Sequence, residues 1–229
     1  MYLARLMISI CVLALAVAGC AGVDSTVGNN YSPRVGDLIF RDSDCGPLCD
    51  AIEKVTAGFK GANLSHVGIV AEEANGRTVV LEAVSSGVVA TDLQEFLYKS
   101  SDIYSPPKVM VGRLKKSYRH LIPAAIKEAE ALKGKPYDKG FIIDNDVYYC
   151  SELIYEIFRR ANSGRPVFKL EPMTFKDPQT GETLAVWQEY FEKLGIEIPE
   201  GEPGINPGGI SRSPLIDIIY MSDSISRKN

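Results

Sequence analysis

Apolar residues recur at helical spacing directly after a pair of tyrosines in the second half of the chain. After Cys150 they follow the i, i+3, i+4, i+7 rhythm of an amphipathic helix, at Leu153, Ile154, Ile157, Phe158 and Ala161. Cys150 would then lie in the first helical turn, where free N–H groups and the helix dipole favour a thiolate over a thiol. The alternative is a buried cysteine that serves only as a small hydrophobic residue.

Two runs rich in β-branched residues, 64–70 and 78–83, predict an antiparallel hairpin. The segment between them contains Asn75-Gly76, a strong turn signal. With the hairpin centred at Ala74, His66 and Glu82 would lie directly opposite each other on one face, with Cβ atoms about 5 Å apart. A slip of one residue would put them on opposite faces, so this register is a specific prediction.

The other periodic segments predict an α+β domain with a small, mostly antiparallel sheet packed against helices. Further strands are expected at 36–40, 87–90, 108–113 and 214–220. Helices are expected at 48–57 and 184–194, and a further helix within residues 117–133. Thr91 is expected to cap a short helix that runs toward Leu97, Asp37 to cap a turn, and His120 to lie on the surface. The domain should span residues 33–220, including a loop-rich cap and connector at 163–212, and residues 221–229 should form a tail. Residues 201–209, rich in proline and glycine, are expected to be flexible.

The first twenty residues predict export. Arg5 precedes an apolar run, residues 6–17, that is too short to span a bilayer comfortably, so residues 1–19 are interpreted as a signal peptide. Its end, Val17-Ala18-Gly19-Cys20, resembles the bacterial lipobox, in which the cysteine is lipidated. A plain secretory signal or a retained anchor is the alternative. Residues 20–32 would form a flexible tether, and the expected location is the bacterial cell envelope, on the periplasmic or surface side.

Composition and charge narrow the class of protein. The 229 residues are 45% hydrophobic and 24% charged, as is usual for a folded globular domain. Removal of the signal would take away Arg5 and change the net charge from −4 to −5. This acidic balance argues against nucleic-acid binding, and membrane attachment would come from the lipid.

Export also changes the meaning of the five cysteines. Cys11 would leave with the signal and Cys20 would carry the lipid, so three remain in an oxidising compartment. Cys45 and Cys49 are close enough to pair, although one helical turn between them would suit a disulfide poorly. Pro47 favours a loop or helix start there. Cys150 would be the free thiol. A zinc site of Cys45, Cys49, His66 and Cys150 is an alternative, but no metal or other cofactor is expected.

The candidate chemistry centres on a cysteine, a histidine and an acid. The chain has two histidines, and His66 is the one with a predicted acid partner. An imidazole can form an ion pair with a thiol while a carboxylate fixes its tautomer. A core histidine and a surface acid are the alternatives for His66 and Glu82.

Four short motifs resemble a known family. These are Ser65-His66-Val67-Gly68-Ile69-Val70, Leu81-Glu82-Ala83, Pro136-Tyr137-Asp138 and Tyr149-Cys150-Ser151-Glu152-Leu153. In this order they resemble the YiiX-like, circularly permuted branch of the NlpC-type papain-like cysteine hydrolases. The resemblance runs from Gly36 to about Ala161, with a weaker echo at Asn206-Pro207 and Ser213-Pro214.

The resemblance implies a permuted papain-like fold with Cys150 as nucleophile, His66 as base and Glu82 as orienting acid. The third position varies among papain-like enzymes, and the segment with Cys45 and Cys49 is not part of the general pattern. The reaction would be acyl transfer, in which the thiolate attacks an amide or ester carbonyl and water resolves the thioester. The Cys150 backbone N–H, with Tyr137 or Ser151 nearby, would contact the oxyanion or the substrate.

The cap residues bear on the substrate. If the cap overhangs Cys150, its apolar side chains would favour an apolar acyl group; otherwise they only seal the cap onto the core. These side chains are Phe168, Met173, Phe175, Trp187, Tyr190 and Phe191. The expected function is an amidase or peptidase acting on an amide with an apolar or acyl portion, such as an N-acylated small molecule or lipid. The alternatives are a cell-wall peptide endopeptidase, a lipid acyltransferase and a non-catalytic lipoprotein that binds lipid or peptide.

Overall fold

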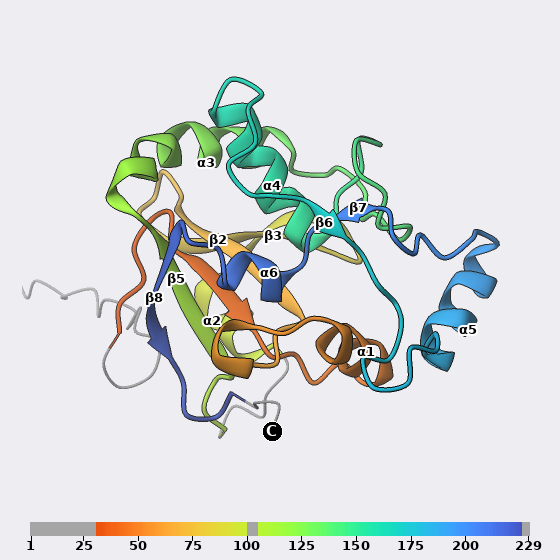
Figure 1. Cartoon of the computed structure of the whole chain (residues 1–229). Coiled ribbons are helices and arrows are strands. Elements are labelled where there is room, and N and C mark those ends of the chain that lie inside the picture. Colours follow the sequence, from red (N-terminus) through yellow and green to blue (C-terminus); the bar gives the residue numbers. More distant parts are fainter. Residues whose placement is uncertain (1–30, 100–104, 226–229) are drawn as a thin grey trace, which may run out of the picture.

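A six-stranded antiparallel sheet forms the centre of the computed structural model, which describes residues 31–99 and 105–225 (Figure 1). The strand order is β4-β3-β2-β1-β5-β8. The strands are β1 (Leu38–Arg41), β2 (His66–Glu72), β3 (Thr78–Val84), β4 (Gly87–Asp92), β5 (Val109–Leu114) and β8 (Ile216–Met221). The predicted signal peptide, Cys20 and most of the predicted tether lie outside the described residues.

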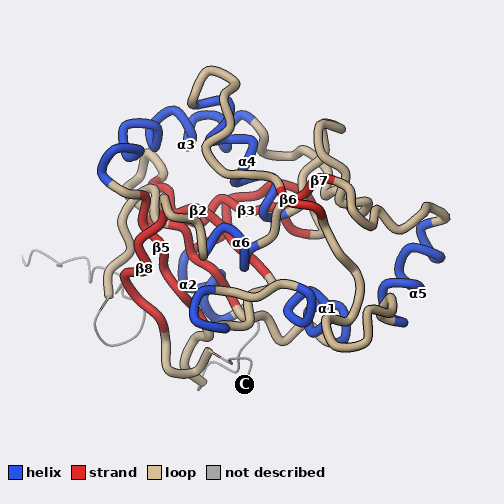
Figure 2. The backbone as a smooth tube through the Cα atoms, in the orientation of Figure 1, coloured by secondary structure: helices blue, strands red, loops and turns tan. Residues whose placement is uncertain are grey.

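Helices cover both faces of the sheet (Figure 2). One face packs on α3 (Ile122–Ala131) and α4 (Cys150–Ala161) through Val67, Ile69, Leu81, Leu153 and Ile157. The other face packs on α2 (Leu93–Tyr98) through Ile39, Val70, Val80, Phe96 and Leu97. Side chains alternate between the two sides of each strand, so each strand can contribute apolar residues to the packing on both faces. No helix within 31–99 or 105–225 has the length and apolar character that crossing a bilayer requires.

The β2–β3 hairpin differs from the predicted register by two residues. Glu72 pairs with Thr78, so the centre of the hairpin is Asn75 and not Ala74. The turn is a short loop closed by the Glu73–Arg77 backbone pair, with Gly76 at φ 82°, a left-handed conformation that suits glycine. A shift of two residues preserves the face on which each side chain lies.

The start of one predicted helix is wrong. Thr91 belongs to β4, and Asp92 caps α2 by accepting a hydrogen bond from Gln94 N at 2.8 Å. The helix expected within residues 117–133 is confirmed as α3, which starts at Ile122 next to Pro123 and follows a 3₁₀ segment, Lys116–Leu121. Proline is favoured in a first helical turn because it has no N–H to satisfy.

The residues just before β1 contact the sheet. Tyr31 was expected in the flexible tether, but its hydroxyl bonds to Asp37 and its ring stacks on Tyr220 at 5.6 Å. Asp37 accepts a bond from Arg34 N, as a turn cap would, and also pairs with Arg113 at 2.7 Å. His120 is exposed, as predicted.

The C-terminal cap wraps around α1 (Pro47–Val55). It contains β6 (Glu171–Pro172), α5 (Ala185–Leu194), β7 (Pro203–Gly204) and α6 (Pro207–Ser211). The segment predicted to be a flexible connector therefore holds a strand and a helix. A Cβ on Gly208 would lie 2.7 Å from the Ala57 carbonyl oxygen, so this glycine permits close packing of α6 against the chain after α1.

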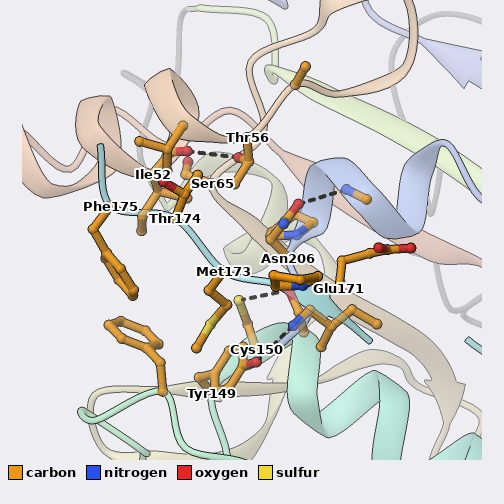
Figure 3. A pocket seen from close by; sticks show the side chains of 18 of the residues that line it. Ile52, Thr56, Ser65, Tyr149, Cys150, Glu171, Met173, Thr174, Phe175 and Asn206 are labelled. Carbon is orange, nitrogen blue, oxygen red and sulfur yellow. Dashed lines mark hydrogen bonds between the residues drawn. The ribbon is translucent and has the colours of Figure 1, made fainter. Parts of the chain in front are cut away.

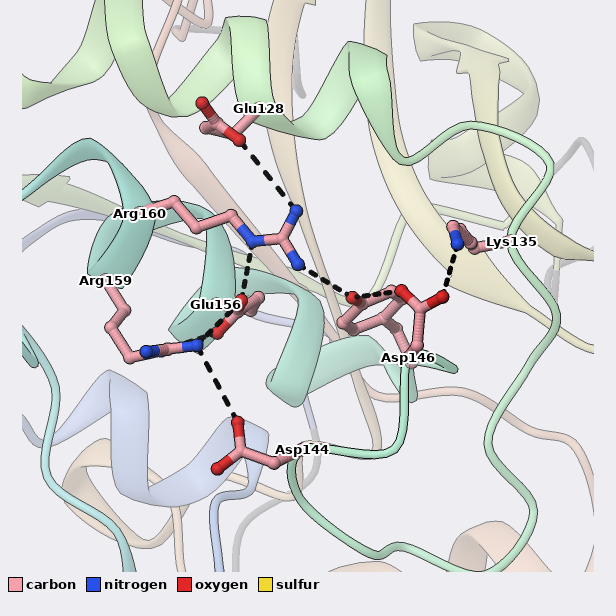
Figure 4. Close-up of polar contacts among 8 residues, drawn as sticks. Glu128, Lys135, Asp144, Asp146, Glu156, Arg159 and Arg160 are labelled. Atoms are coloured by element: carbon pink, nitrogen blue, oxygen red, sulfur yellow. Dashed lines mark hydrogen bonds and ion pairs between the residues drawn. The ribbon is translucent and has the colours of Figure 1, made fainter. Parts of the chain in front are cut away.

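A network of ion pairs fixes the outer end of α4 (Figure 4). Glu156 accepts hydrogen bonds from Arg159 at 2.7 Å and from Arg160 at 2.5 Å. Arg160 also approaches Glu128 of α3 at 3.9 Å and bonds to the Tyr148 hydroxyl at 3.0 Å. Because these contacts join α4 to α3 and to the preceding loop, they hold the helix in the orientation that places its first residue at the sheet.

Candidate active site

Cys150 is the first residue of α4 and lies beside the start of β2. Its side chain is buried, with 7% exposure, and it is the free cysteine of the described residues. The Ser151 hydroxyl lies 3.7 Å from the thiol sulfur, and the Val67 backbone N–H also bonds to it. The first N–H groups of a helix have no acceptor within the helix, so the start of α4 presents free donors around this thiol.

His66 and Glu82 meet across the neighbouring strands β2 and β3. His66 Nε2 lies 2.5 Å from Glu82 Oε2, although the two residues are diagonal neighbours and not directly opposite. The Glu82 side chain is fully buried and its other oxygen accepts a 2.5 Å bond from the Thr91 hydroxyl. With Nε2 occupied by Glu82, Nδ1 is the ring nitrogen left for the thiol of Cys150.

Hydrogen bonds and opposite charges favour the ionised pair, although burial opposes it. Burial raises the pKa of Cys150, but the hydrogen bond and charge of His66 outweigh burial and leave this pKa below its ordinary value. Burial lowers the pKa of His66, but bonds to Cys150 and Glu82 leave it raised. Burial likewise raises the pKa of Glu82, while His66, Thr91 and Lys99 bring it down to about 2. Glu82 is therefore a carboxylate at neutral pH.

Tyr137 borders the same cavity as Cys150. Burial, followed by the negative charge of Cys150, raises the pKa of this tyrosine well above its ordinary value. The hydroxyl therefore stays protonated and can donate a hydrogen bond. Tyr149, the residue before the helix, uses its hydroxyl to accept a bond from Ile205 N at 3.1 Å and ties the cap to the start of α4.

A cavity of about 260 Å³ opens beside Cys150 (Figure 3). In this view Cys150 and Ile52 lie on opposite sides of it, with Met173 between them. Its apolar lining includes Ile52, Val55, Met173, Phe175 and Trp187, and its polar lining includes Ser65, Asn206 and Arg212. The cap thus overhangs the cysteine, and its apolar side chains face the space next to the thiol.

Not all six aromatic and methionine residues of the cap contribute to this cavity. Met173, Phe175 and Trp187 line it. Tyr190 and Phe191 instead pack on Phe141, with ring centroids 6.0 and 6.3 Å away. Phe168 packs on Phe158 in the main core at 5.7 Å. The cap residues therefore form two subsets. One subset lines the cavity beside Cys150, and the other packs the cap onto the core.

Comparison with known proteins decides the family. A family model described as "Permuted papain-like amidase enzyme, YaeF/YiiX, C92 family" matches residues 32–220. The chain belongs to this family. The α+β, permuted papain-like fold predicted from the sequence is thereby confirmed, and the chain is assigned to a family of cysteine hydrolases.

Two relatives from Escherichia coli are similar to this permuted papain-like amidase. The "Uncharacterized protein YiiX" of strain K12 is 26% identical over 192 residues, covering 82% of this chain and 87% of the relative. The crystal structure of "metalloprotein yiiX" from E. coli O157:H7 matches with a TM-score of 0.65 and 24% identity. That match covers 84% of this chain and 99% of the other chain, and it shows the shared fold.

The residues weighed as a zinc site do not fit a metal. Cys45 and Cys49 form a disulfide, with Cα atoms 5.5 Å apart. Cys45 precedes α1 and Cys49 lies in its first turn, so the pair does not span one regular helical turn. Across residues 31–99 and 105–225, no group of three or more histidine, cysteine or acidic residues could hold a metal ion.

Three polar residues near the site were missed from the sequence. Thr91 was assigned to a helix cap, Arg41 carried no assignment, and Asn206 appeared only as part of a weak echo. Glu82 pairs with Val89, so Thr91 follows two residues later on the same face and reaches the carboxylate diagonally. Asn206 caps α6 by accepting a bond from Gly209 N at 2.7 Å and borders the cavity. Only knowledge of the strand pairing and of the cap could have revealed these positions.

Proposed function

We propose that this permuted papain-like amidase hydrolyses amides that carry an apolar or acyl portion, through a thioester on Cys150. The observation that carries the proposal is the mainly apolar cavity that opens at the buried thiol next to the paired His66 and Glu82. Cys150 would be the nucleophile, His66 the general base and acid, and Glu82 the group that orients the imidazole.

The reaction would proceed in two halves. The Cys150 thiolate attacks the carbonyl carbon, forming a C–S bond and an oxyanion that the Cys150 N–H and the Tyr137 hydroxyl can stabilise. When the C–N bond breaks, the proton on His66 passes to the departing nitrogen, which leaves as an amine. Water then attacks the thioester while His66 takes its proton, and the acid product leaves with the thiolate restored.

The cavity wall argues for an apolar group beside the scissile bond. Phe175 is 4% exposed and Trp187 is 2% exposed, so these rings form a firm wall and not a mobile surface. Each CH₂ that a substrate buries against such a wall is worth about 0.8 kcal/mol, or roughly a fourfold gain in kcat/KM. An N-acylated small molecule or a lipid amide would use this wall, with its amide at the polar end near Asn206.

Cleavage of a cell-wall peptide is the second candidate. Glu171 and Arg212 are exposed charged residues on the cavity border, and they would suit a substrate with both an amine and a carboxylate. A lipoprotein that binds lipid or peptide without cleaving it would use the same cavity but would not need a reactive thiol.

The proposed location is the bacterial cell envelope. The support is the sequence pattern at residues 1–20, in which a short apolar run ends in Val17-Ala18-Gly19-Cys20. A lipid on Cys20 would hold the domain at a membrane, within reach of amide-bearing lipids and of cell-wall peptides. Labelling with a radioactive fatty acid, lost in a Cys20→Ala variant, would test the anchor.

Side-by-side assays test the substrate. N-acyl amino acids of increasing chain length should be cleaved with rising kcat/KM, and purified muropeptides should be poor substrates. Phe175→Trp should reduce the gain for the longest chains, because it adds volume at the cavity wall. Tyr190→Phe, in the same aromatic cluster but away from the cavity, should not. Efficient muropeptide cleavage with no gain from chain length would favour the second candidate.

A further inference from the structure

Arg41 places a positive charge in the protein interior behind the candidate site. It is the last residue of β1, pairs with His66 of β2 in the sheet register, and is only 6% exposed. Directly opposed residues of an antiparallel pair project from the same face, so the two side chains are neighbours.

The contacts of the guanidinium are neutral. Nε donates to the Ser43 hydroxyl at 2.8 Å and Nη1 donates to the Phe96 carbonyl at 2.7 Å. The guanidinium carbon lies 4.8 Å from the centre of the Phe96 ring, and the His66 ring lies 5.8 Å from the same ring. Within the described chain, no carboxylate forms an ion pair with Arg41.

A buried cation without an ion-pair partner needs negative charge nearby to be tolerated. The anionic groups whose charges act on Arg41 are Glu82 and Cys150, and both favour its charged form against the effect of burial. Electrostatic interaction is mutual, so Arg41 favours the carboxylate of Glu82 and the thiolate of Cys150 to the same extent.

We propose that Arg41 is a positioning residue that stabilises the Cys150 thiolate and holds the Phe96 ring against His66. It touches neither substrate nor reacting atoms. The proposal rests on the function proposed above, because it assigns Arg41 a role only if Cys150 reacts as a thiolate.

Other ionisable groups act on the same thiol or on its neighbours, and they must be kept unchanged in a test. They approach from β2, from β3, from the end of α2, from the loop before α4 and from α4 itself. His66, Tyr137 and Tyr149 act on the thiol itself; Glu82, Asp138 and Glu152 act on these three residues, and Lys99 acts on Glu82. Burial raises the pKa of Glu152 to about 8, so Glu152 gains its negative charge in the alkaline range, and this ionisation must be included when the pH profile is fitted.

The test is the rate of Cys150 alkylation by iodoacetamide as a function of pH, measured on the full domain without substrate. Arg41→Gln keeps hydrogen-bonding groups but removes the charge, and should raise the midpoint by about one pH unit. Below the midpoint, such a shift makes the alkylation roughly tenfold slower. Arg41→Met should do the same and serves if the glutamine variant is poorly folded. Arg41→Lys restores the charge and should return the midpoint toward that of the wild type.

Arg113→Met is the matched control. Arg113 is a partly buried arginine of the same sheet, but it pairs with Asp37 just before the opposite end of β1. Its loss should lower stability without moving the alkylation midpoint. A folded Arg41→Gln or Arg41→Met variant with the wild-type midpoint, or an equal shift in Arg113→Met, would overturn the proposal. A wild-type Cys150 with the midpoint of an ordinary thiol would instead overturn the proposed function, and this inference with it.

Discussion

Glu82 offers the sharpest test of the electrostatics, through the stability of the fold at different pH values. Its carboxylate is fully buried between His66 and Thr91, and its pKa falls from 4.5 to about 2 on folding. A folded-state pKa below the unfolded one stabilises the native state above the unfolded pKa. That contribution is lost as the pH falls from about 4.5 toward about 2.

The difference between the two pKa values sets the magnitude. At 1.36 kcal/mol per pKa unit, ionised Glu82 contributes about 3 kcal/mol to the free energy of unfolding at pH 7. At pH 3 the unfolded carboxyl is largely protonated, and only about 1 kcal/mol remains. Glu82→Gln cannot ionise, so the gap between wild type and variant should shrink by about 2 kcal/mol from pH 7 to pH 3.

Urea unfolding at the two pH values measures this gap. Glu189→Gln is the control, because Glu189 forms an exposed pair with Lys193 at 3.8 Å that should contribute less than about 1 kcal/mol at either pH. In a His66→Ala background, Glu82→Gln should show a smaller pH dependence, since the main countercharge is gone. An equal gap at pH 7 and pH 3, or a larger one at pH 3, would refute the idea that Glu82 is held ionised.

Three further predictions concern the thiol and its neighbours. Cys150 should be the one rapidly alkylated cysteine of the folded domain, because Cys45 and Cys49 form a disulfide. Peptide mapping after iodoacetamide treatment measures the labelling of each cysteine, and equal labelling of Cys45 would contradict the prediction. His66→Ala should reduce kcat/KM at least about a hundredfold, and the kcat/KM of the wild type should show a bell-shaped dependence on pH. A His66→Ala variant that keeps its activity would exclude His66 as the base. Thr91→Val should reduce kcat/KM less than His66→Ala does, because it removes one hydrogen bond from an uncharged donor to Glu82 and leaves the ion pair with His66. A loss as large as that of His66→Ala would mean that Thr91 has a role beyond this bond.

Local patterns predicted most elements of this fold because the periods of helices and strands depend on near neighbours. The run after Cys150 forms a helix that begins at that residue, and the predicted strands lie within about two residues of those observed. The start of α2 was less predictable. Thr91 and Asp92 are both good caps by residue type, and the choice between them depends on how far β4 remains paired with β3.

Composition misled where glycine has a packing role. Residues 201–209 contain four glycines and two prolines, a composition typical of a flexible connector. A Cβ on Gly204 would meet the Met173 side chain, and one on Gly208 would meet the Ala57 backbone. These glycines therefore allow close approach between cap and core, and the sequence does not reveal which neighbour requires them.

The hairpin shows which part of a site can be read from one strand pattern and which part cannot. His66 and Glu82 share a face in either register, because a shift of two residues preserves the alternation of side chains. Their contact, however, runs along a diagonal, and a diagonal neighbour is within reach only of a long side chain with free space beside it. Gly68 provides that space: a Cβ at this position would lie 3.3 Å from Glu82 Cβ and 2.4 Å from a Val80 methyl carbon. The glycine two residues after His66 is thus a steric requirement of the imidazole–carboxylate pair. This role could not be predicted from the sequence, because it depends on the strand register and the predicted register was wrong by two residues.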